Sequence, residues 1–192
     1  GSSSERWSTM TRVALGQGKM FTRPLAAFMH LIIYAGFIII NIELLEIVLD
    51  GITGHHRVFS YLGSFYNFLI GSFEVLAMLV LLACVVFLAR RNAIRIKRFW
   101  MREMTSWPRT DANIILIAEI LLMSAFLSMN ACDSILQSQG VDHYVQAGSF
   151  PVSQLVVPML ENFSNESLIL IERSCWWFHI IGILSFALYV TY

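Results

Sequence analysis

The sequence has no pair of cysteines spaced as CxxC. Its three cysteines are Cys84, Cys132 and Cys175, and each lies within or at the end of an apolar stretch. An iron–sulfur cluster or a structural zinc normally takes four ligands, so this chain alone is not expected to hold either. Buried free thiols are the simplest expectation, and a Cys132–Cys175 disulfide is the alternative.

Charge is scarce, and the two signs balance. Lys and Arg together number 13, as do Asp and Glu, and the net charge of zero argues against nucleic acid as a partner. The sequence contains no nucleophile–base constellation, phosphate-binding loop or catalytic zinc spacing, and no internal repeat or domain linker. It starts without Met, lacks a signal-peptide pattern and stops inside an apolar stretch, so we expect a single domain that is a fragment at both ends.

What the chain has in abundance is apolar residues. Hydrophobic residues make up 57% of it and the mean hydropathy is +0.66, which places it among membrane proteins. About 20 mostly apolar residues span a bilayer. The sequence predicts an all-α fold, an integral membrane four-helix bundle, with spans at about 24–50, 61–89, 111–132 and 167–192.

Basic residues are concentrated on one side of these spans. Four precede residue 24, seven lie between Arg90 and Arg109, Arg57 alone lies in the first link, and none lies between 133 and 166. The positive-inside rule then places both ends and the loop 90–110 in the cytoplasm, with an outer cap at 133–166. Trp100 and Trp107 occupy headgroup-type positions, and part of this loop is expected to form an amphipathic surface helix.

Two histidines lie inside predicted spans. His30, Tyr34, Phe37 and Asn41 are spaced i, i+4, i+7 and i+11, so they share one helix face, which we expect to point into the bundle. His179 lies inside the last span. A neutral imidazole in a helix bundle is a common axial ligand for haem iron, and the alternative is a polar residue hydrogen-bonded to a neighbouring helix.

The depths of the two histidines differ. His30 lies seven residues past Arg23, roughly 10 Å from the cytoplasmic end of its helix, and His179 lies six past Arg173, roughly 9 Å from the outer end. In a hydrocarbon core of about 30 Å they differ in depth by about 10 Å. We therefore expect them to serve two different haem layers, unless one helix is strongly tilted.

Two strings carry a family resemblance. RPLAAFMH at 23–30 and WWFHIIG at 176–182 resemble the two histidine-bearing helices of the nitrate reductase gamma-subunit family of cytochromes b. The chain is most similar to the membrane part of the iron–sulfur-binding, heterodisulfide-reductase-like proteins of Bacteroidetes, and ERWSTMTRVALGQGKM at 5–20 and REMTSWPRTDANIILIAEILLM at 102–123 extend the likeness. The family has five spans, so four of the five are expected here.

The resemblance implies a function and its ligands. Family members take electrons from menaquinol or another quinol, through one or two haem b groups, to a cytoplasmic iron–sulfur domain or subunit. His30 matches the inner axial ligand and His179 the outer one. The family's second histidine on the first of these helices corresponds to Ile40, and another falls beyond Tyr192, so each site is expected to be incomplete here. His56 is a candidate substitute at the outer haem.

Further polar groups remain open to two interpretations. Glu43, Glu46, Glu74 and Glu119 suit interhelical hydrogen bonds better than a proton path. A quinol pocket on the outer face could be lined by His55, His56, Asp142 and His143. The alternative is that these four are exposed loop residues with no binding role.

Three functions remain as hypotheses. The first is an electron-transfer domain in a bacterial inner membrane, in contact with lipid, quinol and an iron–sulfur partner that holds any clusters. The second is a cofactor-free four-span scaffold or assembly protein whose buried polar groups only hold helices together. The third is an ion or proton transporter using the four membrane glutamates.

Overall fold

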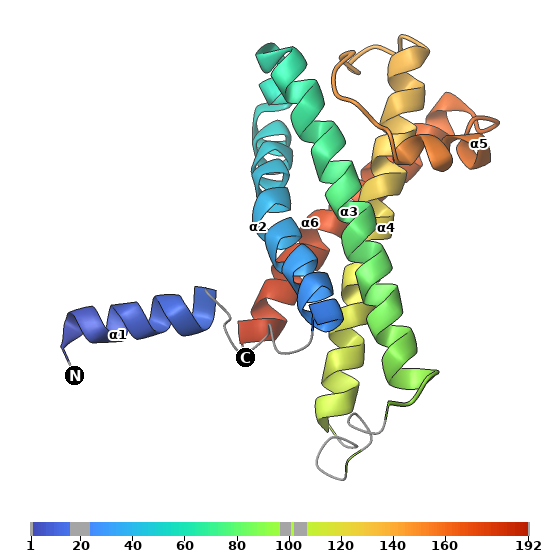
Figure 1. The fold of residues 1–192 in the computed structure, drawn as a ribbon. Helices are drawn as coiled ribbons and strands as arrows, with labels where there is room; N and C mark the ends of the chain where they lie inside the picture. The colour runs from blue at the N-terminus through green and yellow to red at the C-terminus, as the bar shows by residue number, and fades with distance from the viewer. Residues whose placement is uncertain (1, 16–23, 97–100, 102–106, 192) are drawn as a thin grey trace.

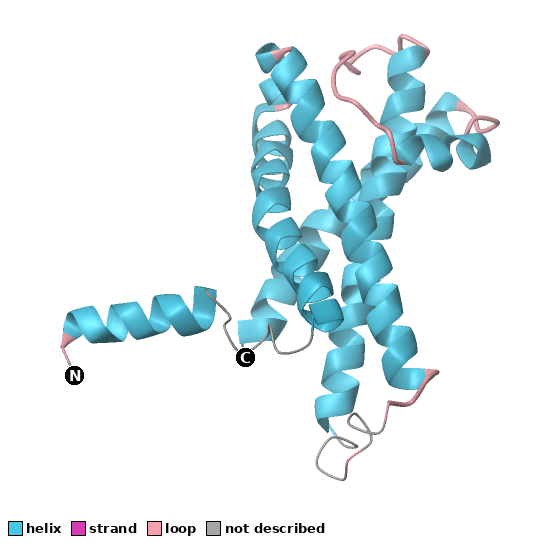
Figure 2. Ribbon diagram, viewed as in Figure 1, coloured by secondary structure: helices cyan, strands magenta, loops and turns pink. Residues whose placement is uncertain are grey.

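The computed structural model describes residues 2–15, 24–96, 101 and 107–191 (Figure 1). All regular structure in these described residues is helical (Figure 2). Within these described ranges, four helices are long and apolar enough to cross a membrane: α2 (Pro24–Thr53), α3 (Ser64–Asn92), α4 (Trp107–Ser138) and α6 (Asn165–Thr191). The predicted all-α helical membrane bundle is confirmed, and the chain is a membrane protein whose spans meet lipid.

The four spans pack in chain order. The main interfaces join α2 to α3, α3 to α4, and α4 to α6. Figure 1 shows α6 crossing the other spans obliquely rather than running parallel to them. Helices suit this environment because every backbone N–H and C=O group in a span must find its hydrogen-bond partner within the protein.

Among the four spans, α4 differs most from its predicted bounds. This helix begins at Trp107, because Pro108 fits a first turn whose amides have no helical partner, and it continues to Ser138 rather than ending at Cys132. Asp133 therefore lies in a span and is buried, although the sequence pattern placed it in the cap. Arg90 and Arg91, predicted to start the basic loop, form the last turn of α3.

Short helical elements lie before the first span and in the connections between spans. Before α2 the chain forms α1 (Ser3–Met10), begun by a capping box between Ser2 and Glu5, and the π-helical turn η1 (Thr11–Leu15). The α2–α3 link contains η3 (Val58–Leu62), and the α4–α6 connection contains η6 (Ser153–Leu155) and α5 (Val157–Leu160). We call the end of the bundle that carries these two connections the cap end. The predicted amphipathic helix in the basic loop falls mainly outside the described residues.

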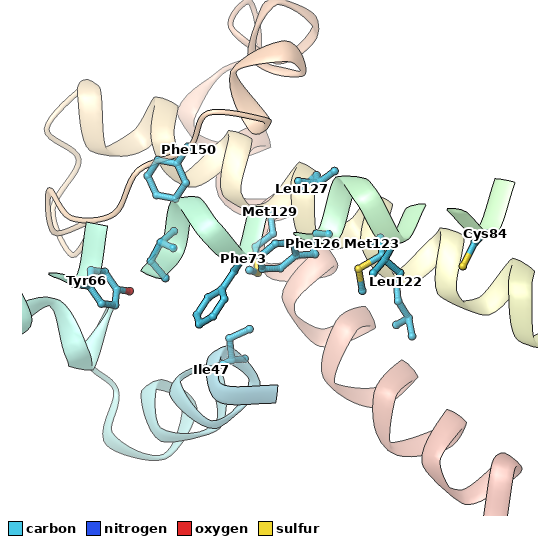
Figure 3. Packing of buried hydrophobic residues seen from close by; sticks show 13 residues of the cluster. Ile47, Tyr66, Phe73, Cys84, Leu122, Met123, Phe126, Leu127, Met129 and Phe150 are labelled. Carbon is cyan, nitrogen blue, oxygen red and sulfur yellow. The ribbon is translucent and has the colours of Figure 1, made fainter. Parts of the chain in front are cut away.

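The core is an apolar seam shared by three spans. Figure 3 shows Phe73 of α3, Phe126 and Leu122 of α4 and Ile47 of α2 gathered together, with Phe150 reaching in from the α4–α6 connection. At the α4–α6 crossing, a Cβ atom on Gly182 would lie 2.6 Å from Leu122 Cδ2. Only glycine permits this approach, which is how small residues let membrane helices pack closely.

Candidate functional site at the cap end

The α2–α3 link folds back into the bundle at Arg57. This residue has φ +55°, a left-handed conformation that costs a non-glycine residue roughly 1–2 kcal/mol. The Asp50 carboxylate holds the turn by accepting hydrogen bonds from the backbone N–H groups of Arg57 and Val58, both at 2.9 Å. The turn places a charged side chain, only 6% exposed, among the spans.

The Arg57 guanidinium joins α3 and α4 to the link. It donates to Asp133 Oδ2 from Nε at 3.0 Å and from Nη2 at 2.7 Å, to Asn130 Oδ1 at 2.9 Å and to Tyr66 Oη at 3.3 Å. It also lies 5.1 Å from the centroid of the Phe150 ring. Burial by itself lowers the pKa of Arg57, but Asp133, Tyr66 and Glu43 together more than offset this and raise the pKa well above its usual value.

His56 lies beside this ion pair with both ring nitrogens engaged. The backbone N–H of Val145 donates to Nδ1 at 3.0 Å, so the proton belongs on Nε2, which lies 3.0 Å from Asp133 Oδ1. The neutral ring thus connects the α4–α6 connection to Asp133. These contacts leave no free nitrogen for a haem iron in the described arrangement, and the predicted ligand role of His56 stays a prediction.

Two of the membrane glutamates accept several hydrogen bonds. Glu46 accepts from Tyr66 Oη at 2.7 Å and from the Phe59 backbone N–H at 2.9 Å. Glu74, fully buried in α3, accepts from Asn130, from the Ser153 hydroxyl and from two backbone N–H groups of the α4–α6 connection. The connection therefore dips into the bundle and is fastened there. For these two residues the interhelical interpretation describes their contacts well.

Glu43 differs from the other acids. It is 2% exposed, and neither carboxyl oxygen has a hydrogen-bond partner among the described residues. Its recorded ion pair is with Arg57 Nη1 at 3.6 Å, beyond ordinary hydrogen-bond length. We refer to Glu43, Glu46, Arg57, Glu74 and Asp133 as the Arg57 cluster.

Two cavities adjoin the Arg57 cluster. The first, the polar pocket, has a volume of about 240 Å³ and lies between the α2–α3 link, α4 and the start of α6. Its charged and aromatic lining includes His55, His56, Arg57, Asp133, His143, Glu172, Arg173, Trp176 and Trp177. Of the four predicted pocket residues, His55, His56 and His143 are therefore brought together, while Asp142 is not among the lining residues.

The rim of the polar pocket carries a neutral imidazole. His143 Nε2 lies 3.2 Å from Arg173 Nη2, so Nε2 accepts and Nδ1 carries the proton. Burial and the Arg173 charge lower the pKa of His143 below 6.5. Beside it, burial and the nearby Glu172 carboxyl raise the pKa of Tyr144, whose hydroxyl donates to Glu172 at 3.3 Å.

The second cavity, the lateral cavity, lies between α2, η3 and α3 and has a volume of about 200 Å³. Apolar and aromatic side chains line most of it: Ile42, Phe59, Tyr61, Leu62, Leu69, Ile70 and Phe73. Its polar groups are Glu43, Glu46 and Tyr66. Ile42 and Leu62 on its border are exposed on the surface of the bundle, so the cavity adjoins lipid. This cavity could not be recognised in the sequence, because its lining residues resemble ordinary residues of a membrane span.

His179 is buried and oriented. It is 1% exposed, and its Nδ1–H donates to the Leu122 backbone carbonyl at 3.2 Å. The ring lies 5.7 Å from Phe126. A hydrogen bond from Nδ1 to a carbonyl fixes the tautomer that leaves a lone pair on Nε2, which is how metal-binding histidines are usually held. The predicted ligand role of His179 remains a prediction.

His30 does not point into the bundle, and that expectation is wrong. The buried side of α2 follows Met29, Gly36 and Glu43, at intervals of seven residues, and His30 lies about 100° around the helix from Met29. Its side chain is exposed in this chain. The predicted inner ligand role has no support from its surroundings and remains a prediction.

The remaining predicted groups are scattered. Glu119 and Asn41 line a cavity of about 40 Å³ near Leu122, enough for a water molecule. All three cysteines are free, with Cys84 and Cys132 buried. Within the described ranges, no three His, Cys, Asp or Glu side chains are arranged to hold a metal ion. Comparisons with family models, with curated proteins and with solved structures gave no match.

Proposed function

We propose that this chain is the membrane domain of a b-type cytochrome, which takes electrons from menaquinol or another quinol near the cap end and passes them to a cytoplasmic iron–sulfur domain or partner. The observation that carries the proposal is the lateral cavity. This cavity lies at the lipid-facing surface of the bundle and is lined by aromatic side chains. Two carboxyl groups and a tyrosine hydroxyl lie at its inner wall.

The chemistry of this cavity suits a quinol head group. A quinol is an amphiphile, with a flat ring carrying two hydroxyls and a long apolar tail. Pockets for drug-sized ligands usually measure about 300–1,000 Å³, so a smaller cavity suits a single ring whose tail stays in lipid. Phe59 and Phe73 contribute aromatic rings to the lining, and Glu43, Glu46 and Tyr66 place polar groups at its inner wall.

Haem b would supply reversible one-electron chemistry at its iron. Of the two predicted ligands, His179 has the burial and the fixed tautomer that axial ligation needs, while His30 is exposed. We therefore propose His179 as a haem ligand of this chain. Its hydrogen bond to the Leu122 carbonyl holds the ring plane, and the Phe126 ring keeps water from it.

The proposed orientation follows from charge. Both ends of the chain and the basic residues between α3 and α4 face the cytoplasm of a bacterial inner membrane, and the cap end faces outward. In that orientation the polar pocket, with His56 and His143 in its lining, opens on the side where quinol oxidation releases protons.

The test uses the purified full-length protein in lipid nanodiscs. Reduction by dithionite should give b-type absorption bands, and a short-tailed menaquinol should reduce the same haem. His179→Ala should remove at least one haem, whereas His143→Ala should keep the haem content. Leu69→Trp, which fills the lateral cavity, should slow reduction by quinol and leave dithionite reduction intact. Leu79→Trp, on the lipid-facing side of α3, is its matched control.

One observation favours the scaffold as a second candidate. The Arg57–Asp133 pair and the Glu74 hydrogen bonds fasten α3 and α4 to the two connections at the cap end. A colourless preparation from haem-replete cells would support that alternative and contradict the cytochrome.

A further inference from the structure

The Arg57 cluster holds four carboxyl groups against one guanidinium. No member is more than 6% exposed. An ionised carboxylate removed from water needs a counter-charge or several hydrogen bonds, and without them protonation costs less than keeping the charge. Some carboxyl groups of the cluster must therefore carry protons.

The hydrogen bonds identify which acid is least able to stay ionised. Asp133 accepts two bonds from Arg57, one from Gln137 and the contact with His56, so it is the natural carboxylate partner of the guanidinium. Glu46 and Glu74 each accept bonds from neutral donors. Glu43 accepts none, and the Arg57 Nη1 nearest to it is directed to Tyr66 Oη at 3.3 Å.

The charged groups around Glu43 also favour its protonated, neutral form. Facing it are Glu46 from its own helix, Tyr66 and Glu74 from α3, Asp133 from α4 and Arg57 from the link. Asp133 already neutralises Arg57 at 2.7 Å. An additional negative charge on Glu43 would therefore meet three other acids and a cation that is already paired.

We infer that Glu43 is an uncharged, proton-carrying carboxylic acid at the wall of the lateral cavity, and that its O–H group turns to hydrogen-bond a ring oxygen when a ligand enters there. The binding part of this inference rests on the proposed quinol function. A protonated carboxyl both donates and accepts, so it matches the carbonyl of a quinone and the hydroxyl of a quinol alike. Glu43 thus selects a flat ring bearing oxygen over a plain hydrocarbon.

The first experiment is infrared spectroscopy of the purified protein in nanodiscs near neutral pH. A protonated carboxylic acid has a C=O stretching band that shifts in D₂O, and we expect one component of this band to be lost in Glu43→Gln. Glu46→Gln, one turn along the same helix, is the matched control and should keep that component. An unchanged band in Glu43→Gln would overturn the inference. If that variant does not fold, Glu43→Asp should shift the component, and an unshifted band would overturn it equally.

The second experiment titrates a short-tailed naphthoquinone into the same samples. Binding should lower the frequency of the Glu43 component, and Glu43→Leu should weaken binding about tenfold, as loss of a buried hydrogen bond implies. Glu43→Gln retains a donor and should bind nearly as well as the natural protein. If no sample binds the quinone while the band behaves as expected, the quinol function fails and the proton site stands. If Glu43→Leu binds as tightly as the natural protein, the ligand role fails.

Discussion

The Arg57–Asp133 ion pair gives the sharpest test of what holds the cap end together. Both residues are buried, and the guanidinium donates to the carboxylate twice. Removing one partner leaves an uncompensated charge inside the bundle, a loss of about 3–5 kcal/mol. Replacing both partners with apolar residues of similar volume is often nearly neutral. Arg57→Met and Asp133→Leu should therefore each destabilise the protein strongly, and the double variant should recover most of the loss.

The assay is thermal unfolding in one detergent, followed by circular dichroism. At about 2–4 °C per kcal/mol for a chain of this size, each single variant should lower the midpoint by about 6–20 °C. The midpoint of the double variant should decrease by much less than the sum of the two single decreases. Asp142→Asn, at an exposed position, is the control and should change stability by less than about 0.5 kcal/mol. Additive losses in the double variant would mean that the two residues contribute independently, and the reasoning would be refuted.

Three other predictions concern topology, packing and pH. Single cysteines placed between residues 90 and 109 should resist labelling by a membrane-impermeant thiol reagent added outside intact cells, because that loop is assigned to the cytoplasm; labelling from outside would reverse the topology. Gly182→Val should destabilise the α4–α6 crossing by about 1–3 kcal/mol through overpacking, and Leu122→Ala should relieve part of the strain; equal losses with and without Leu122→Ala would contradict this. Because the pKa of His143 is below 6.5 in the folded state, the unfolded chain binds more protons as the pH falls below about 6.5, so stability should decrease there, and His143→Gln should flatten that part of the profile.

The spans were predictable because the bilayer imposes their length and apolar composition. The rotation of each span about its own axis, which decides the face that is buried, could not be predicted. Helix α2 is apolar on all sides, so hydropathy does not reveal that Met29, Gly36 and Glu43 face the bundle while His30 does not. A buried face in a membrane helix is decided by fit, as at Gly36, where an added Cβ would lie 2.8 Å from Val80.

The candidate site was only partly visible in the sequence. His55, His56 and the membrane glutamates are unusual in the sequence, and His179 is buried as expected. Asp133 was assigned to the cap because a charged residue after an apolar run resembles the end of a span. Its partner lies 76 positions away, and only the folded chain brings the two together. The lateral cavity could not be predicted, since a void between two helices depends on their crossing and on the shape of η3.

The fastening of Glu74 also constrains how this protein is made. Its hydrogen-bond partners, Asn130, Val152 and Ser153, are synthesised long after α3 has reached the membrane. A charged Asp at the centre of an inserting helix costs about 2.5–3.5 kcal/mol, and a glutamate is expected to behave similarly. The apolar run LAMLVLLACVVFLA that follows Glu74 offsets this, since each of its Leu, Val and Phe residues contributes about 0.3–0.6 kcal/mol in favour of insertion. Helix α3 thus enters the bilayer before the hydrogen-bond donors of Glu74 exist, and those donors follow only with α4 and the α4–α6 connection.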